Sequence, residues 1–135
     1  MRFLYLFSLL ILMCYNINAQ VYNPSSGYVS SFQKISSTSG SFSGLLDLQD
    51  GFGSEIENIG DFDGNGVNDI AVGAISDDDG AYNAGAVWIL LLNNTGNVIN
   101  HYKISATSGG FASPLDADDH FGCSIANIGD LDNDG

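Results

Sequence analysis

The sequence contains very few basic residues. Lysine and arginine together number 3 in a chain of 135 residues, against 16 acidic residues, and the formal net charge at pH 7 is −13. A chain of this charge repels a polyanion such as DNA or RNA instead of neutralising its phosphates. Nucleic acid is therefore excluded as a partner.

Long apolar runs are also missing, apart from one near the N-terminus. Residues 3–15 are apolar, follow Arg2 and precede the small residue Ala19, which is the pattern of a secretory signal peptide. The run is too short to span a bilayer, which takes about 20 apolar residues. We predict a signal peptide over residues 1–19, a secreted or cell-surface protein, and no membrane span within this sequence.

Cysteine is scarce, with only Cys14 and Cys123 in the chain. Cys14 raises the alternative of a lipid anchor, but Met13 before it is bulkier than such processing usually tolerates. Removal of the signal peptide leaves Cys123 as a single thiol, so no disulfide can form within the mature chain. We expect Cys123 to be a buried thiol on a strand.

The chain repeats itself. Residues 27–66 and 96–135 align without gaps at an offset of 69, and 21 of the 40 aligned positions are identical. A period of about 70 residues indicates tandem supersecondary units. Because the second copy stops inside its own acidic loop, we expect this chain to be an N-terminal fragment, with further repeats C-terminal to residue 135.

One period predicts four strands and no helix. The expected strands, each apolar or alternating and bounded by turn residues, are 52–60, 68–75, 85–93 and 97–105. Four antiparallel strands per tandem repeat are typical of a β-propeller blade. The predicted fold is therefore all-β, with one full repeat at about 52–105 and partial repeats before and after it within residues 20–135. A stacked β-solenoid is the competing architecture, but its repeats are usually shorter.

The segment between the first two expected strands gathers oxygen-bearing side chains at alternate positions. Like charges this close repel one another unless a cation lies between them. Calcium takes six to eight hard oxygen ligands, and a glycine at the sixth position allows the loop to curl. The EF-hand alternative fails because Val72 stands where that motif needs a glutamate. The predicted Ca²⁺ ligands are Asp61, Asp63, Asn65, the Val67 carbonyl and Asp69.

The second copy supplies equivalent acidic residues. Asp130, Asp132 and Asp134 occupy the first, third and fifth positions of its loop. A turn rich in Asp, Asn and Gly without metal is the alternative for either loop, but two such loops in repeat register favour a cation site.

These residues carry a family resemblance. Phe52 and Gly53, the loop 61–69 and the following stretch 71–75 resemble an FG-GAP repeat, the blade unit of integrin α-subunit propellers. Phe121 and Gly122 begin the matching stretch of the second copy, and Ile75 departs from the proline in the family's name. The resemblance implies a calcium loop on the face opposite the ligand-binding surface. Ligand contacts are then expected on the loops 36–51, 76–84 and 105–120.

Several lesser features favour ordinary structural roles. Asp77, Asp78 and Asp79 suggest a second cation site, but a solvated turn is the preferred interpretation. His101 and His120 lack a metal-ligand pattern and are expected at the surface. Tyr82 and Trp88 are candidates for stacking on a sugar, although Trp88 sits in the most apolar strand and is expected in the core. Asn93 begins an N-glycosylation acceptor sequence on a predicted turn.

Two functions remain open. The sequence shows no Ser/His/Asp or Cys/His nucleophile set, so we expect a non-catalytic module for extracellular adhesion or ligand recognition, with calcium in a structural role. Its partner would be an extracellular protein or glycan. The alternative is an accessory region of a secreted hydrolase or lyase whose catalytic domain lies beyond residue 135. Fold alone does not decide between the two.

Overall fold

The structure is a computed structural model that describes residues 29, 31–111 and 113–131. The chain divides into two units, residues 1–32 and residues 33–135, and the fold below is that of the second. The predicted signal peptide, residues 1–19, and two of the predicted ligands, Asp132 and Asp134, lie outside the described residues.

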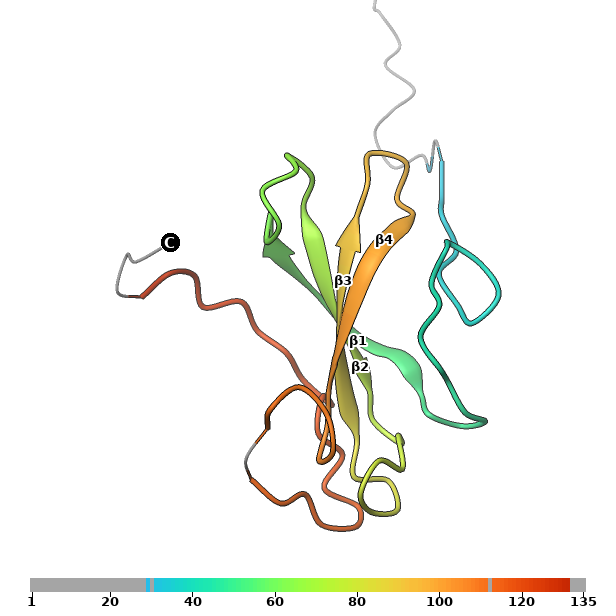
Figure 1. Ribbon diagram of the computed structural model, residues 1–135, viewed down its shortest axis with the longest axis vertical. Helices are drawn as coiled ribbons and strands as arrows, with labels where there is room; N and C mark the ends of the chain where they lie inside the picture. Colours follow the sequence, from blue (N-terminus) through green and yellow to red (C-terminus); the bar gives the residue numbers. More distant parts are fainter. Residues whose placement is uncertain (1–28, 30, 112, 132–135) are drawn as a thin grey trace, which may run out of the picture. The chain divides into compact units, whose positions relative to one another are not determined.

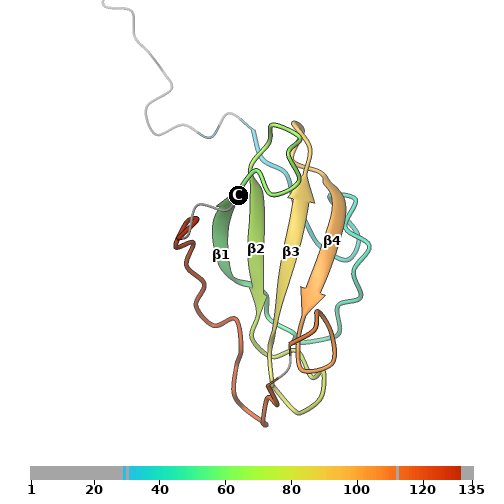
Figure 2. The same cartoon turned by 60° about the vertical axis from the view of Figure 1, so that its left-hand side comes forward.

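Four strands form one antiparallel sheet in chain order (Figures 1 and 2). They are β1 (Phe52–Gly60), β2 (Asp69–Ala74), β3 (Ala86–Leu92) and β4 (Val98–Ile104). The described residues contain no helix, and therefore none able to cross a bilayer. The all-β prediction is confirmed, each predicted strand lies within one residue of its observed bounds, and a four-stranded antiparallel sheet is consistent with one blade of a propeller.

The order of the strands places the loops at two opposite ends of the sheet. The loop 61–68 joins β1 to β2, and the turn 93–97 joins β3 to β4 at the same end (Figure 2). A hydrogen bond of 3.0 Å from the Asn65 side-chain amide to the Leu92 carbonyl links this loop to the end of β3. The loop 75–85 lies at the other end of the sheet.

Side chains that alternate along the strands build the core on one face of the sheet. Val72 on β2 lies opposite Trp88 on β3, with Ile70 opposite Leu90 beside it. Successive residues of a strand point to opposite faces, so these apolar side chains share one face. Phe42 covers them, with its ring centroid 5.1 Å from that of Trp88 in an edge-to-face contact. Trp88 is only 4% exposed, which confirms its predicted place in the core.

The opposite face of the sheet is covered by the segment that follows residue 120. Gly73 on β2 lies so close to the Gly122 carbonyl oxygen that a Cβ at position 73 would collide with it. Phe121 donates its backbone N–H to the Ala84 carbonyl at 2.9 Å and forms a parallel bridge with Gly85. Because both faces are covered, β3 is buried along most of its length.

The 69-residue repeat recurs in the local structure. The stacked rings of Phe42 and Phe52, 5.2 Å apart, have their counterpart in Phe111 and Phe121, 5.0 Å apart. The Asp50 carboxylate accepts the Asp47 N–H at 2.7 Å, and the equivalent pair, Asp119 and Asp116, makes the same bond at 2.7 Å. Paired turns also recur at residues 36–39 and 105–108. These local features therefore recur in both copies, as the sequence repeat predicts.

The predicted environments of three side chains are wrong. Cys123 is exposed and lies outside any strand, because within the described residues no neighbouring strand pairs with its segment along its length. His101 is half-buried, not at the surface, because its ring lies 5.0 Å from Phe42 and 5.5 Å from Trp88. His120 is also half-buried, with Nδ1 2.9 Å from the Ile75 carbonyl oxygen.

Candidate cation site and acidic pocket

The loop 61–69 begins directly after β1 and closes on the first residue of β2. Glycines at positions 60, 64 and 66 have positive φ angles of 79°, 76° and 86°. Side chains other than hydrogen disfavour this conformation, so glycine allows the chain to reverse within a few residues. The tight reversal brings the start and the end of the loop together.

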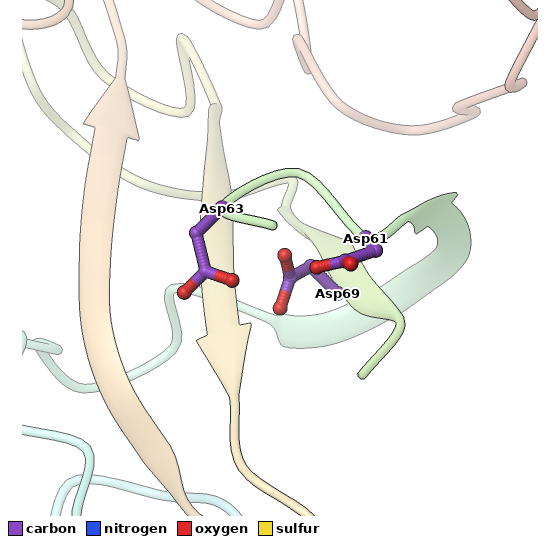
Figure 3. A group of neighbouring side chains, drawn as sticks. All are labelled: Asp61, Asp63 and Asp69. Atoms are coloured by element: carbon purple, nitrogen blue, oxygen red, sulfur yellow. The ribbon is translucent and has the colours of Figure 1, made fainter. Parts of the chain in front are cut away.

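Three carboxylates of this loop converge. Each of Asp61, Asp63 and Asp69 offers an oxygen within 4.8 Å of the others, and Figure 3 shows the three side chains directed at a common space. Asp61 and Asp63 are exposed, whereas Asp69 is fully buried at the base of the group. We call these three residues the aspartate group. The sequence treats them as equivalent ligands, but only the fold distinguishes the buried one.

Backbone N–H groups hold the carboxylates in place. Asp61 Oδ2 accepts the Gly66 N–H at 2.8 Å, and Asp63 Oδ1 accepts the Asn65 N–H at 3.0 Å. Asp69 accepts two, from Phe62 at 2.8 Å and from Leu92 at 2.8 Å. A carboxylate oxygen has two lone pairs, so each of these bonds leaves room for a cation on the same oxygen. These hydrogen bonds thus fix the direction of the carboxylate oxygens.

Asn65 is oriented by its own hydrogen bonds. Its amide nitrogen donates to Asp63 Oδ2 at 3.0 Å, and its amide oxygen accepts the Val67 N–H at 2.8 Å. A donor therefore faces Asp63 in this arrangement, and the amide oxygen has one lone pair left for a cation. The assignment of Asn65 and of the Val67 carbonyl as ligands stays a prediction.

The chemistry of the aspartate group suits a hard divalent cation. Its oxygens are carboxylates, and both calcium and magnesium prefer such ligands. Calcium tolerates a flexible shell of six to eight oxygens, whereas magnesium demands a near-ideal octahedron. In the second copy, the structure describes Asp130 alone of the three predicted ligands.

A second acidic cluster already holds a cation of its own chain. Lys103 on β4 places Nζ 2.7 Å from Asp77 Oδ2 and 2.7 Å from Asp79 Oδ2. The Asp77 side chain is only 3% exposed, so the interpretation of this stretch as a solvated turn is wrong for that residue. Lys103 also lies over the Trp88 ring, 5.3 Å from its centroid. We call Lys103, Asp77 and Asp79 the lysine cluster.

Lys103 and Asp79 each favour the charged form of the other. The hydrogen bond from Lys103 holds the pKa of Asp79 below its ordinary value, against the opposing effect of burial. Burial by itself lowers the pKa of Lys103, but hydrogen bonds to Asp77 and Asp79 outweigh it and raise that pKa. The Lys103 ammonium group therefore lies beside Asp77 and Asp79, where the sequence suggested a second cation site.

Sequence reasoning missed this role of Lys103. The lysine lies 26 positions after Asp77, so no local motif joins them. One signal was available: the chain has only three basic residues, so a lysine on a strand next to a run of aspartates has a high chance of pairing with them.

A pocket of about 470 Å³ opens beside the lysine cluster. Its lining includes Asp47, Asp50, Asp77, Asp79, Trp88 and Lys103. Asp50 is largely buried, and this burial raises its pKa above the ordinary value, with the Asp77 charge adding to the effect. Residues from two of the expected ligand loops, 36–51 and 76–84, thus line one acidic pocket.

One stretch of the chain matches a known family. Residues 55–90 match the family model of the FG-GAP repeat, which confirms the resemblance drawn from the sequence over this stretch. The match runs from the middle of β1 to β3 and includes the loop 61–69. Neither a curated protein nor a solved structure gave a match to the chain.

Proposed function

Since residues 55–90 match the FG-GAP repeat, we propose that this protein is a calcium-binding β-propeller module, secreted or displayed at the cell surface, for extracellular adhesion or ligand recognition. The aspartate group carries the proposal, because three carboxylates converge inside the matched stretch. The module is non-catalytic, and its partner is an extracellular protein or glycan. The signal-peptide pattern of residues 1–19 supports export.

Calcium would act as a structural tie between three strands. The ion would bind exposed Asp61 and Asp63 from the loop and buried Asp69 from the start of β2. Asp69 in turn accepts the Leu92 N–H at the end of β3. An ion at this point removes the repulsion among the carboxylates and stabilises the folded state as its concentration rises. At a free concentration one hundred times its Kd, the gain is about 2.7 kcal/mol.

Ligand recognition would take place away from the calcium. The acidic pocket is lined from the loops 36–51 and 76–84, and the second of these lies at the end of the sheet opposite the loop 61–69. Calcium would thus support the sheet without contacting the ligand. This division supports a structural role for the ion.

Calorimetric titration of the purified chain with Ca²⁺ and with Mg²⁺ tests the proposal. Asp63→Asn keeps the size of a side chain that is hydrogen-bonded to Asn65 within the loop, and removes one charge. We expect it to weaken Ca²⁺ binding at least about tenfold, or about 1.4 kcal/mol. Asp78→Asn is the matched control, because Asp78 is an exposed acid outside the loop.

Two results would overturn the calcium assignment. One is an affinity for Ca²⁺ that is the same in the Asp63→Asn variant as in the original chain. The other is tighter binding of Mg²⁺ than of Ca²⁺. Export has its own test: secretion of the full chain by a host cell, with N-terminal sequencing, should show cleavage after Ala19.

A further inference from the structure

Leu92, at the end of β3, lies beyond the ladder that joins β2 to β3. The last residue pair of that ladder at this end is Ile70 with Leu90. Two side chains of the loop 61–69 bind the backbone of Leu92 instead. Its N–H donates to Asp69 Oδ1 at 2.8 Å, and its carbonyl accepts the Asn65 side-chain amide at 3.0 Å. These two side chains therefore take the place of a neighbouring strand beside Leu92.

Backbone groups determine which way the Asn65 amide points. Its oxygen accepts the Val67 N–H at 2.8 Å, and its nitrogen donates to the Leu92 carbonyl at 3.0 Å. The reversed amide would place two donors together at Val67 and two acceptors together at Leu92. The nitrogen also donates to Asp63 Oδ2 at 3.0 Å. Both ends of the amide are thus used, and its nitrogen joins the loop to β3.

A carboxylate at position 65 would not make the same contacts. Aspartate has the shape of asparagine and could still accept the Val67 N–H, but an ionised carboxylate has no hydrogen to donate. It would place an oxygen against the Leu92 carbonyl and a negative charge against Asp63, and like charges this close repel. The second copy of the repeat has aspartate, Asp134, at the equivalent position. The two copies therefore differ in the one residue that joins this loop to β3 as a donor.

We propose that Asn65 is a positioning residue, which fastens the loop 61–69 to β3 through donors that an amide supplies and a carboxylate does not. Every partner of this amide is a group of the chain itself, so the fastening needs no ion. Asn65 also holds both oxygens of Asp63, one through its N–H and the other through its amide. A loop fixed in this way loses less conformational entropy when it binds a cation. The fastening does not rest on the proposed calcium binding, whereas the effect of calcium described below does.

Hydrogen exchange of the full chain in a chelator, followed by mass spectrometry, tests the proposal with Asn65→Asp. This variant keeps an acceptor for the Val67 N–H and removes both donors. We expect the amides of residues 61–68 and of Leu92 to exchange at least about tenfold faster than in the original chain, because the Leu92 carbonyl loses its donor and faces an acceptor. The amides of residues 72–90 are the internal reference and should exchange at the same rate in both chains.

Two further variants separate the loss of the donors from the added charge. Asn68→Asp is the matched control, because Asn68 is an exposed asparagine of the same loop and takes no part in these hydrogen bonds. It adds the same charge and should exchange as the original chain does. Asn65→Ala removes the amide without adding a charge, and it carries the test if Asn65→Asp does not fold. Exchange of its loop should be at least about threefold faster, as for the loss of one or two exposed hydrogen bonds.

Calcium should reverse the effect of Asn65→Asp completely and that of Asn65→Ala only in part. A carboxylate at position 65 would share the cation with Asp63, which turns their repulsion into a common attraction, whereas alanine offers no oxygen. A residue with only a general structural role would give the same loss with the ion and without it. Near-ultraviolet circular dichroism, which reports on Trp88, shows whether each variant has folded.

The outcomes separate this proposal from the calcium assignment. Equal exchange of the loop by the Asn65→Asp and Asn68→Asp variants in a chelator would overturn the proposal. Loop exchange in the original chain as fast as in an unstructured peptide would do the same, as would an unchanged rate in Asn65→Ala. Faster exchange in Asn65→Asp that Ca²⁺ does not reverse supports the fastening by Asn65 and contradicts the calcium assignment.

Discussion

Asp69 is predicted to stabilise the fold even without calcium. It is a fully buried carboxylate, and it accepts the Phe62 N–H and the Leu92 N–H, each at 2.8 Å. Phe62 belongs to the loop and Leu92 to the end of β3, so this single side chain joins two segments 30 residues apart. Asp69→Ala removes both acceptors at once.

The cost of this substitution follows from the two donors. A buried donor left without a partner costs about 1–3 kcal/mol. Because both bonds are only partly buried, the lower half of that range applies, which gives about 2–4 kcal/mol for the pair. The total stability of a domain is about 5–15 kcal/mol, so this is a large share of it. Calcium is not involved in this part of the loss.

Urea denaturation in the presence of a chelator measures the effect. Trp88 fluorescence follows the core, and far-ultraviolet circular dichroism follows the sheet. Asp61→Ala is the matched control, because Asp61 is an exposed member of the same aspartate group and accepts one N–H within the loop, that of Gly66. We expect a loss below about 1 kcal/mol for this control, as for most exposed sites.

A third variant separates the two roles of Asp69. Asp69→Asn keeps one oxygen acceptor and places an amide donor against the second N–H. We expect its loss of stability in chelator to lie between those of Asp61→Ala and Asp69→Ala. If Asp69→Ala and Asp61→Ala destabilise the chelated protein equally, the buried carboxylate has no structural role of its own, and the reasoning is refuted.

Three further predictions concern the acidic pocket and the packing of the repeat. Asp50→Asn should raise the melting temperature at pH 7, because burial raises the pKa of Asp50 and its charged form therefore destabilises the folded state. This gain in melting temperature should shrink as the pH falls through the raised pKa toward 3.8, the ordinary pKa of an aspartate. Lys103→Met keeps the side-chain stem over Trp88 but leaves Asp77 buried without its ammonium partner. Urea denaturation should show that the free energy of unfolding falls by about 2 kcal/mol, which is the cost of breaking a buried ion pair reduced for partial exposure. An unchanged denaturation midpoint would contradict the pairing. Gly73→Ala should destabilise by about 1–3 kcal/mol through overpacking against Gly122, and faster hydrogen exchange across 121–129 should locate the effect there.

The strands and the repeat were predictable because their signals are local. Each strand is a short apolar or alternating run bounded by glycine, asparagine or aspartate, and these residues set the turns by their own backbone preferences. The loop 61–69 was predictable for the same reason, since its acidic residues are separated by at most eight positions. The repeat required only a comparison of the chain with itself.

The prediction of a buried Cys123 failed for a physical reason. The sequence of 121–129 is that of a strand, but a strand buries its residues only when neighbours pair with it and cover it. Its first-copy equivalent is β1, and there Ser54, which corresponds to Cys123, is exposed as well although β2 lies beside the strand, because the register of β1 and β2 shifts between Phe52 and Ile56. The strand propensity of the segment 121–129 was correctly identified, but strand propensity does not determine which side chains are buried.

The sequence by itself determined the elements of this protein: four strands, the glycine-rich acidic loop and the 69-residue period. Only the tertiary structure decided which charges are buried and what balances them. Asp69 differs from Asp61 and Asp63 because β3 lies against it, and Asp77 finds its cation in Lys103 because β3 and β4 fold back beside the loop. Burial and pairing depend on contacts between segments that are separated by more than 20 residues in the chain, and a local residue pattern does not determine such contacts.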